Sequence, residues 1–233
     1  MPNHIKNRIE IIGDLNLINE LIEEFSTYHH AEINKTDNGL FICRAGEGHG
    51  FGWLNSSTGE FERRNEKTVI GIPEGWKVEV NDSFLHFPDF NKIIPQPSNI
   101  FKGNLGEKER EMCLREGRPN WYDWNIENWG TKWGAYSCQK IALNIYTFET
   151  AWSAVPKLID AMAMKYPDLK VEYKWADEDT GYNVGFYIYH NGKVEMKQIE
   201  GGSREAYELA FELRPDIKEL YHLVDGEYEY IEE

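Results

Sequence analysis

Four of the chain's eight tryptophans lie within thirteen residues, at Trp121, Trp124, Trp129 and Trp133. Aromatic side chains at this density either build a rigid local core or present flat, weakly hydrated faces to a partner. Lys132 adds a cation beside these rings, next to the tight turn that Gly130 favours. An ammonium group close to aromatic faces and backbone N–H groups suits a phosphate or a nucleobase. The spacing therefore favours a site for a small anionic or nucleotide-like ligand.

The predicted ligand site takes in the rings and the polar residues between them, namely Trp121, Trp124, Asn128, Trp129, Gly130, Thr131, Lys132 and Trp133. The same residues have a purely structural interpretation. A large ring buries about 150–250 Å², so four of them could fix an otherwise loose insertion to a sheet. Composition alone leaves both interpretations open.

The last nine residues, 225–233, carry five acids and no base, with Tyr228 and Tyr230 among them. One interpretation is a solvated, partly frayed tail. The other is a partner-binding segment in which Tyr228 and Tyr230 supply contact area and the acids steer a basic partner.

Other chemistry-bearing motifs are weak. The glycine-rich run 46–52 lacks the Gly-Lys-Ser/Thr ending of a phosphate loop and suggests a hairpin tip. The acidic run 177–179 lacks the length of a calcium loop and suggests a hairpin turn. The three cysteines are far apart and are expected to be reduced and packed. We therefore predict no catalytic residue, metal site or cofactor, and we expect a protein that is not an enzyme.

The charge balance limits the partners. Forty acidic and twenty-five basic residues give a formal charge of −15, which argues against direct nucleic-acid binding and against an anionic membrane surface. The first residues contain no apolar run that predicts a signal peptide, and no window predicts a membrane-spanning helix. We expect a cytoplasmic protein whose partner is a small ligand or a host protein.

Hydrophobic periodicity predicts the elements that must position these residues. Apolar residues at steps of three and four predict helices, with Asp14, Asn120, Ser153 and Ser203 as N-caps. Alternating apolar residues predict strands. The expected strands are 5–12, 83–87, 141–145, 170–175, 184–188 and 193–199, and the expected helices are 15–25, 107–115, 120–130, 155–166 and 203–213.

The order of these elements predicts an α+β fold with a ferredoxin-like split β-α-β-β-α-β core. We expect a single domain, 1–233, with its core at about 1–34, 83–90 and 139–190. A long insertion, about 35–82 and 91–138, separates the two halves. An extension at 191–233 adds a C-terminal hairpin and a helix.

Several motifs in order resemble the YubB-type ferredoxin-like domain family. They are Met1-Pro-Asn followed by Asn7, the strand end Gly13-Asp14, then Phe90-Asn-Lys-Ile-Ile-Pro95, Trp121-Tyr-Asp-Trp124 and Asn128-Trp-Gly-Thr-Lys-Trp133. That family occurs in phages, plasmids and other mobile elements, including Api-type phage proteins of undefined role. His4-Ile5 and Gly134-Ala135 depart from the family's usual Trp-Cys and from its acidic or amide residue after the last tryptophan.

The resemblance implies an uncharacterised phage or plasmid accessory protein. With the tryptophan segment as its surface, we expect a non-enzymatic binding module for the ligand class above or for a host protein. One alternative is an acidic antagonist that imitates nucleic acid on a basic host protein. Another is an enzyme that acts on a nucleotide or another phosphate ester.

Overall fold

The computed structural model describes residues 3–30, 32–35, 41–44, 52–54, 61–63 and 83–231, with side chains described in 3–27 and 86–231. The chain divides into two compact units. One unit joins Met1–Ser26 to Phe87–Glu233, and the other is Thr27–His86.

The larger unit holds most of the regular structure. Its helices are α1 (Leu15–Glu24), α2 (Phe90–Ile93), α3 (Glu107–Glu116), α4 (Trp121–Trp129), α5 (Pro156–Lys165), α6 (Arg204–Leu213) and the 3₁₀ helix η1 (Pro215–Leu220). Its strands are β1 (His4–Ile12), β8 (Tyr136–Ala142), β9 (Ile145–Ala151), β10 (Lys170–Ala176), β11 (Gly185–His190), β12 (Lys193–Lys197), β13 (Tyr221–Val224) and β14 (Glu227–Tyr230).

The smaller unit contains antiparallel strands in two sheets. The first sheet pairs β2 (Thr27–His30) with β7 (Ser83–His86). The second has the order β3 (Glu32–Lys35), β4 (Phe41–Arg44), β5 (Gly52–Leu54) and β6 (Phe61–Arg63).

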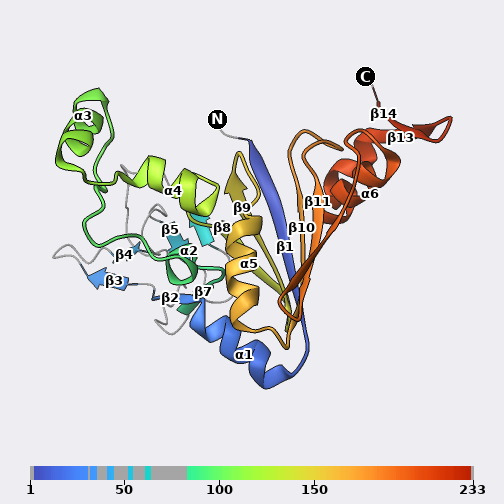
Figure 1. Ribbon diagram of the computed structural model, residues 1–233. Helices are drawn as coiled ribbons and strands as arrows, with labels where there is room; N and C mark the ends of the chain where they lie inside the picture. The colour runs from blue at the N-terminus through green and yellow to red at the C-terminus, as the bar shows by residue number, and fades with distance from the viewer. Residues whose placement is uncertain are drawn as a thin grey trace. The chain divides into compact units, whose positions relative to one another are not determined.

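A six-stranded sheet of order β12-β11-β10-β1-β9-β8 forms the centre of the larger unit. Every neighbouring pair in it is antiparallel, which confirms the prediction of an α+β fold on an antiparallel sheet. Alternate residues of β1, among them Ile5, Ile9 and Ile11, are fully buried on the face that α1 and α5 cover (Figure 1). The core therefore lies between this face and the two helices.

Helix α1 forms as its sequence predicts. The Asp14 carboxylate accepts hydrogen bonds from the backbone N–H groups of Asn16 and Leu17, at 2.9 and 3.3 Å. These bonds satisfy N–H groups that have no partner within the helix. The apolar stripe of α1 is buried, with Ile18 and Leu21 almost inaccessible to solvent.

A buried polar network connects β1, β10 and the start of α5. The Tyr173 hydroxyl donates to the Asn7 side-chain oxygen at 2.6 Å and accepts from the Val155 N–H at 2.8 Å. The N-cap residue of α5 is Val155, which makes no side-chain cap bond. The prediction that Ser153 caps this helix is therefore wrong. A tyrosine distant in sequence satisfies the N–H of that cap residue. Pro156 does lie in the first turn, as predicted.

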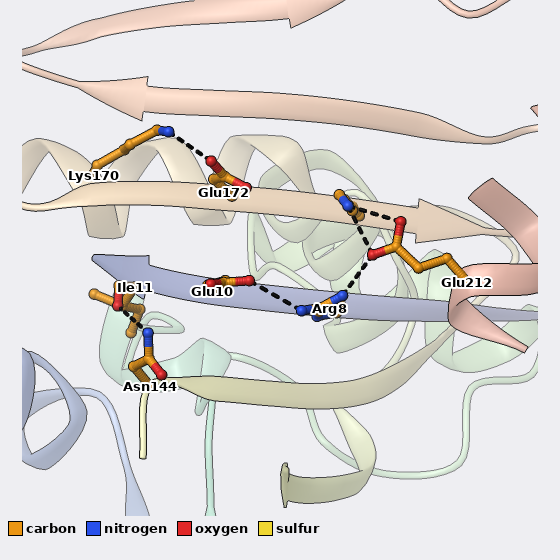
Figure 2. A network of polar contacts seen from close by, with 8 residues as sticks. Arg8, Glu10, Ile11, Asn144, Lys170, Glu172 and Glu212 are labelled. Atoms are coloured by element: carbon orange, nitrogen blue, oxygen red, sulfur yellow. Dashed lines mark hydrogen bonds and ion pairs between the residues drawn. The ribbon is translucent and has the colours of Figure 1, made fainter. Parts of the chain in front are cut away.

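The predicted strand 141–145 is instead a hairpin. β8 ends at Ala142 and β9 begins at Ile145, with a two-residue turn between them. Asn144 fixes this turn to β1, because its backbone and side chain both exchange 2.9 Å hydrogen bonds with Ile11 (Figure 2). The apolar alternation does not reveal the turn, because Ile141 and Leu143 are more than half exposed and face solvent.

The prediction that residues 83–87 supply a strand of the central sheet is also wrong. β7 pairs with β2 in the smaller unit, whereas β8 and β9 are both strands of the central sheet. A strand's own pattern shows that it is half buried but not which partner it pairs with. The other strands and helices predicted after residue 100 are present near their expected positions.

The second face of the central sheet carries charged side chains beside an apolar cluster in which Ala176 packs with Leu209, Ala210 and Leu213 of α6. Arg8 on β1 and Lys174 on β10 both bind the carboxylate of Glu212, which reaches them from α6 (Figure 2). Glu10 adds a bond to Arg8 at 3.0 Å. Exposed ion pairs contribute little stability one by one, so the main effect of this network is to neutralise charge and orient α6.

Candidate functional site

Helix α4 carries the first part of the tryptophan segment. The Asn120 side-chain oxygen accepts from the Asp123 N–H at 3.0 Å and caps the helix start. Gly130 ends the helix in the left-handed conformation, with φ of +82°. Its N–H bonds the carbonyls of Asn125 and Ile126, which is the usual way for a glycine to close a helix. The predicted cap and turn are both confirmed.

Trp129 points into the core. Only 5% of its surface is exposed, and its indole N–H donates to the carbonyl of Ile94 at 2.9 Å. Its ring meets those of Phe90 and Trp124 edge to face, with centroids 5.8 and 5.6 Å apart. Such contacts add to the stabilisation from burial, so Trp129 fastens α4 to the segment around α2.

Three more of the predicted site residues also make contacts within the fold. The Trp121 indole N–H donates to the Gly103 carbonyl at 3.1 Å. The Asn128 amide donates to the Trp124 carbonyl at 2.9 Å. The Thr131 hydroxyl, which is buried, donates to the carbonyl of Ala151 at 2.8 Å. This last bond ties the segment to the end of β9.

Lys132 and Trp133 are placed differently. The Lys132 ammonium lies 3.8 Å from the centroid of the Trp133 ring, and 41% of Trp133 is exposed. Among the described residues, no carboxylate lies within ion-pair distance of Lys132. A cation–π contact stabilises the ammonium without neutralising its charge, so Lys132 can still attract an anion.

Side chains from other elements extend this surface. The Trp133 ring meets Tyr136 on β8 at a centroid distance of 6.5 Å. The Tyr136 hydroxyl is 2.7 Å from Nδ1 of His4 on β1, and Arg214 after α6 donates to the His4 carbonyl. We call the set Lys132, Trp133, Tyr136, His4 and Arg214 the cationic–aromatic surface.

Sequence reasoning did not find Tyr136, His4 or Arg214 as site residues. His4 and Tyr136 are 132 positions apart, and His4 and Arg214 are 210 positions apart. The sheet register brings His4 and Tyr136 together, because β1 and β8 both pair with β9, and the end of α6 supplies Arg214. No local pattern carries that information.

Trp152 lies just beyond β9 and was also missed. It is 52% exposed and has a φ of +71°, a conformation that is costly for a bulky residue. Its N–H donates to the Asn3 carbonyl at 2.9 Å, which supports this backbone conformation. Because Thr131 bonds the neighbouring Ala151, Trp152 lies at the same end of the sheet as the tryptophan segment.

The Tyr136 hydroxyl stays neutral over a wide pH range. Burial, with the charges of Glu149 and Glu178 nearby, raises the pKa of Tyr136 to about 12. An unfolded phenol loses its proton near pH 10, whereas folded Tyr136 retains it up to about 12. We therefore expect stability to fall as pH rises from 10 to 12, and Tyr136→Phe to lessen that fall. Urea unfolding at pH 9 to 12 measures it, and an unchanged pH dependence in the variant would contradict it.

The C-terminal segment is not a frayed tail. Strands β13 and β14 form a hairpin up to Tyr230, and residues 232–233 lie outside the described part. The Tyr228 ring packs on Phe211 and Tyr207 of α6, with centroids 5.0 and 5.7 Å apart. Tyr230 is 56% exposed but meets Tyr221 at 5.5 Å. Aromatic contacts with α6, which the charge pattern does not reveal, order the hairpin.

The remaining motifs can be placed in part. The Asp177 carboxylate, almost fully buried, accepts hydrogen bonds from Asn3, Asn183 and the N–H of Asp179. It holds the turn after β10. Within residues 3–27 and 86–231, no group of three or more His, Cys, Asp or Glu side chains is arranged to hold a metal ion. The glycine-rich run lies outside the described residues except for Gly52, where β5 begins.

Part of the chain is similar to a known protein family. Residues 132–218, from Lys132 through α6 into η1, match the family model of the ferredoxin-like domain in Api92-like protein. This segment is therefore similar to the ferredoxin-like domain of that family. The name of this family gives a fold and no activity. The match begins at Lys132, so it excludes β1, which lies at the centre of the sheet, and most of the tryptophan segment.

The crystal structure of a protein api92 from Yersinia pseudotuberculosis is similar over 86% of this chain and 99% of its own. Its sequence identity is 12% and its TM-score is 0.45. Among curated proteins, no match is found. In the described part of the chain, no helix has the length and apolarity needed to cross a membrane.

Proposed function

We propose that this chain is a non-enzymatic binding protein whose cationic–aromatic surface takes a small anionic, nucleotide-like ligand. One observation carries the proposal. The Lys132 ammonium lies 3.8 Å over an exposed tryptophan ring and has no acidic partner among the described residues. A base can stack on such a ring while its phosphate meets the cation.

The charges around this surface support an anionic ligand. In the described part, Arg8, Lys174 and Arg110 all bind carboxylates, which neutralise them. Arg214 instead donates to a backbone carbonyl, and its Nε atom is buried without a hydrogen-bond partner in the same part. Lys132 and Arg214 form no ion pair in the described part, so their charges favour an anion, whereas the charges of Glu149 and Glu178 near Tyr136 oppose it.

The proposal includes a fold assignment. The order β10-β1-β9-β8, with α1 and α5 on one face, supports a split β-α-β-β-α-β core made of β1, α1, β8, β9, α5 and β10. The rest of the chain between α1 and β8 would then be one insertion. The phage or plasmid setting, and the YubB-type family, come from the sequence resemblance and belong to this proposal too.

A thermal-shift screen tests the proposed ligand. The probes are AMP, GMP, cyclic AMP, inorganic phosphate and Mg²⁺, each added to the purified chain. A ligand at a hundred times its Kd stabilises by about 2.7 kcal/mol, or roughly 5–10 °C in a chain of this size. We expect a nucleotide to give such a shift, and Lys132→Ala to abolish it.

Lys140→Ala is the matched control for that screen. Lys140 is an exposed lysine on β8 whose ammonium lies 5.9 Å from the Tyr146 ring, so the substitution removes the same charge and a similar contact elsewhere. The shift should survive in this variant. Equal loss in both variants would indicate a general charge effect and would contradict the proposed site. No shift with any probe, together with salt-sensitive capture of a basic protein, would favour the antagonist alternative.

A further inference from the structure

The two edges of the central sheet differ in regularity. Strand β8 forms one edge, and its pairing with β9 is irregular at two places, between Tyr136 and Gln139 and between Lys140 and Ala142. Such irregularities protect an edge from pairing with another chain. Strand β12 forms the other edge, and its five residues pair with β11 without a register shift. It therefore presents a regular edge.

The β12 edge also carries exposed apolar side chains. Val194 and Met196 are 55% and 53% exposed, and they lie opposite Tyr189 and Tyr187 on β11. Met164 on α5 is 57% exposed and lines a shallow depression with Tyr189 and Lys193. Val194 and Met196 are thus exposed apolar side chains on the edge strand itself, which a further strand could cover, and Met164 adds apolar surface close to the start of β12.

The turn before β12 determines which backbone groups face outward. Asn191 and Gly192 have φ values of +54° and +66° and form a two-residue turn between β11 and β12. The flanking residues His190 and Lys193 then bond each other, so Lys193 and every second residue after it bond inward. Val194 and Met196 accordingly direct their N–H and C=O groups away from the sheet.

We propose that β12 pairs antiparallel with β12 of a second copy of this chain, with the two-fold axis at Met196. In this register Glu195 of each copy lies opposite Lys197 of the other, which forms two ion pairs across the axis. The outward-facing N–H and C=O groups of Met196 in one copy can then form hydrogen bonds with those of Met196 in the other copy. The ion pairs and the backbone hydrogen bonds therefore both favour the same register.

The neighbouring registers fit less well. An axis at Glu195 would place the two Glu195 carboxylates opposite each other and Lys193 opposite Lys197, and like charges directly opposite are destabilising. An axis at Val194 would pair Met196 with Gly192, which lies in the turn. This interface is at the opposite edge of the sheet from β8, so it is independent of the proposed ligand surface.

Single cysteine substitutions along β12 test which residues lie opposite each other in the dimer. Directly opposed, hydrogen-bonded residues have Cα atoms about 5.5 Å apart, which is within the range of a disulfide. Met196→Cys should therefore form a disulfide-linked dimer under mild oxidation on a non-reducing gel. Val194→Cys and Glu195→Cys should stay at the level of the unmodified chain, whose native cysteines set the background. Efficient cross-linking at position 194 or 195 instead of 196 would overturn the proposal.

Sedimentation tests the dimer without added cysteines. The mass of the unmodified chain should rise from 27.2 kDa toward twice that value as concentration increases. Met196→Lys brings two ammonium groups together at the axis and should keep the chain monomeric. Leu114→Lys, at a residue 84% exposed on α3, is the control and should still dimerise. A monomer at every concentration would overturn the proposal.

Discussion

Trp129→Ala should lower the free energy of unfolding by about 3–5 kcal/mol, the usual cost of truncating a buried tryptophan. The substitution leaves a cavity beside Phe90 and Trp124 and removes the hydrogen bond to the Ile94 carbonyl. That carbonyl would lose its indole donor, which adds to the cost. Urea unfolding followed by circular dichroism measures the change.

Trp133→Ala is the matched control in the same segment. Trp133 is 41% exposed and contacts mainly Lys132 and Tyr136, so its loss should change the unfolding free energy by less than about 1 kcal/mol. Ligand binding, in contrast, should weaken. Equal destabilisation by the two variants would show that the whole segment is core and would contradict the division described above.

Tyr173→Phe should destabilise the chain although it removes a single oxygen atom. Without the hydroxyl, the Val155 N–H and the Asn7 side-chain oxygen each lose a buried partner. An unsatisfied buried group costs about 1–3 kcal/mol, so we expect a loss of roughly 2–4 kcal/mol. Thermal and urea unfolding of the variant test the value.

Tyr187→Phe is the control for this second substitution. Tyr187 lies opposite Tyr173 on β11 but is only half buried, and its hydroxyl bonds no side chain or carbonyl in the described part. The change should stay within about 0.5 kcal/mol. If Tyr173→Phe lowered the free energy of unfolding no more than Tyr187→Phe, the network between β1, β10 and α5 would not stabilise the fold.

Local signals in the sequence predicted most of the secondary structure. Asp14, Asn120 and Ser203 cap helices as expected, because a cap depends on residues within three positions. The cap at Ser153 was wrong because a distant tyrosine bonds the true cap residue. Strand 83–87 was placed in the wrong sheet for a related reason, since pairing depends on residues far away in the chain.

The candidate site shows the same limit. The tryptophan run marks the segment that we propose as the site, but composition could not tell that Trp129 is buried and Trp133 is exposed. The helix ends at Gly130 in the left-handed conformation, and the residue after it, Thr131, bonds Ala151 at the end of β9, so Trp133 does not continue the buried face of α4. His4 and Tyr136 join the surface only through strand register.

Nitrogen-15 NMR of the eight indole groups during titration with AMP and GMP tests the central claim most directly, with Trp133→Phe and Trp129→Phe assigning the two decisive signals. We predict that the Trp133 signal shifts with nucleotide concentration while the Trp129 signal stays in place, and that Lys132→Ala removes the Trp133 shift. If the Trp133 signal stays in place at millimolar nucleotide, or if it shifts equally in the Lys132→Ala variant, the cationic–aromatic surface is not a site for an anionic, nucleotide-like ligand.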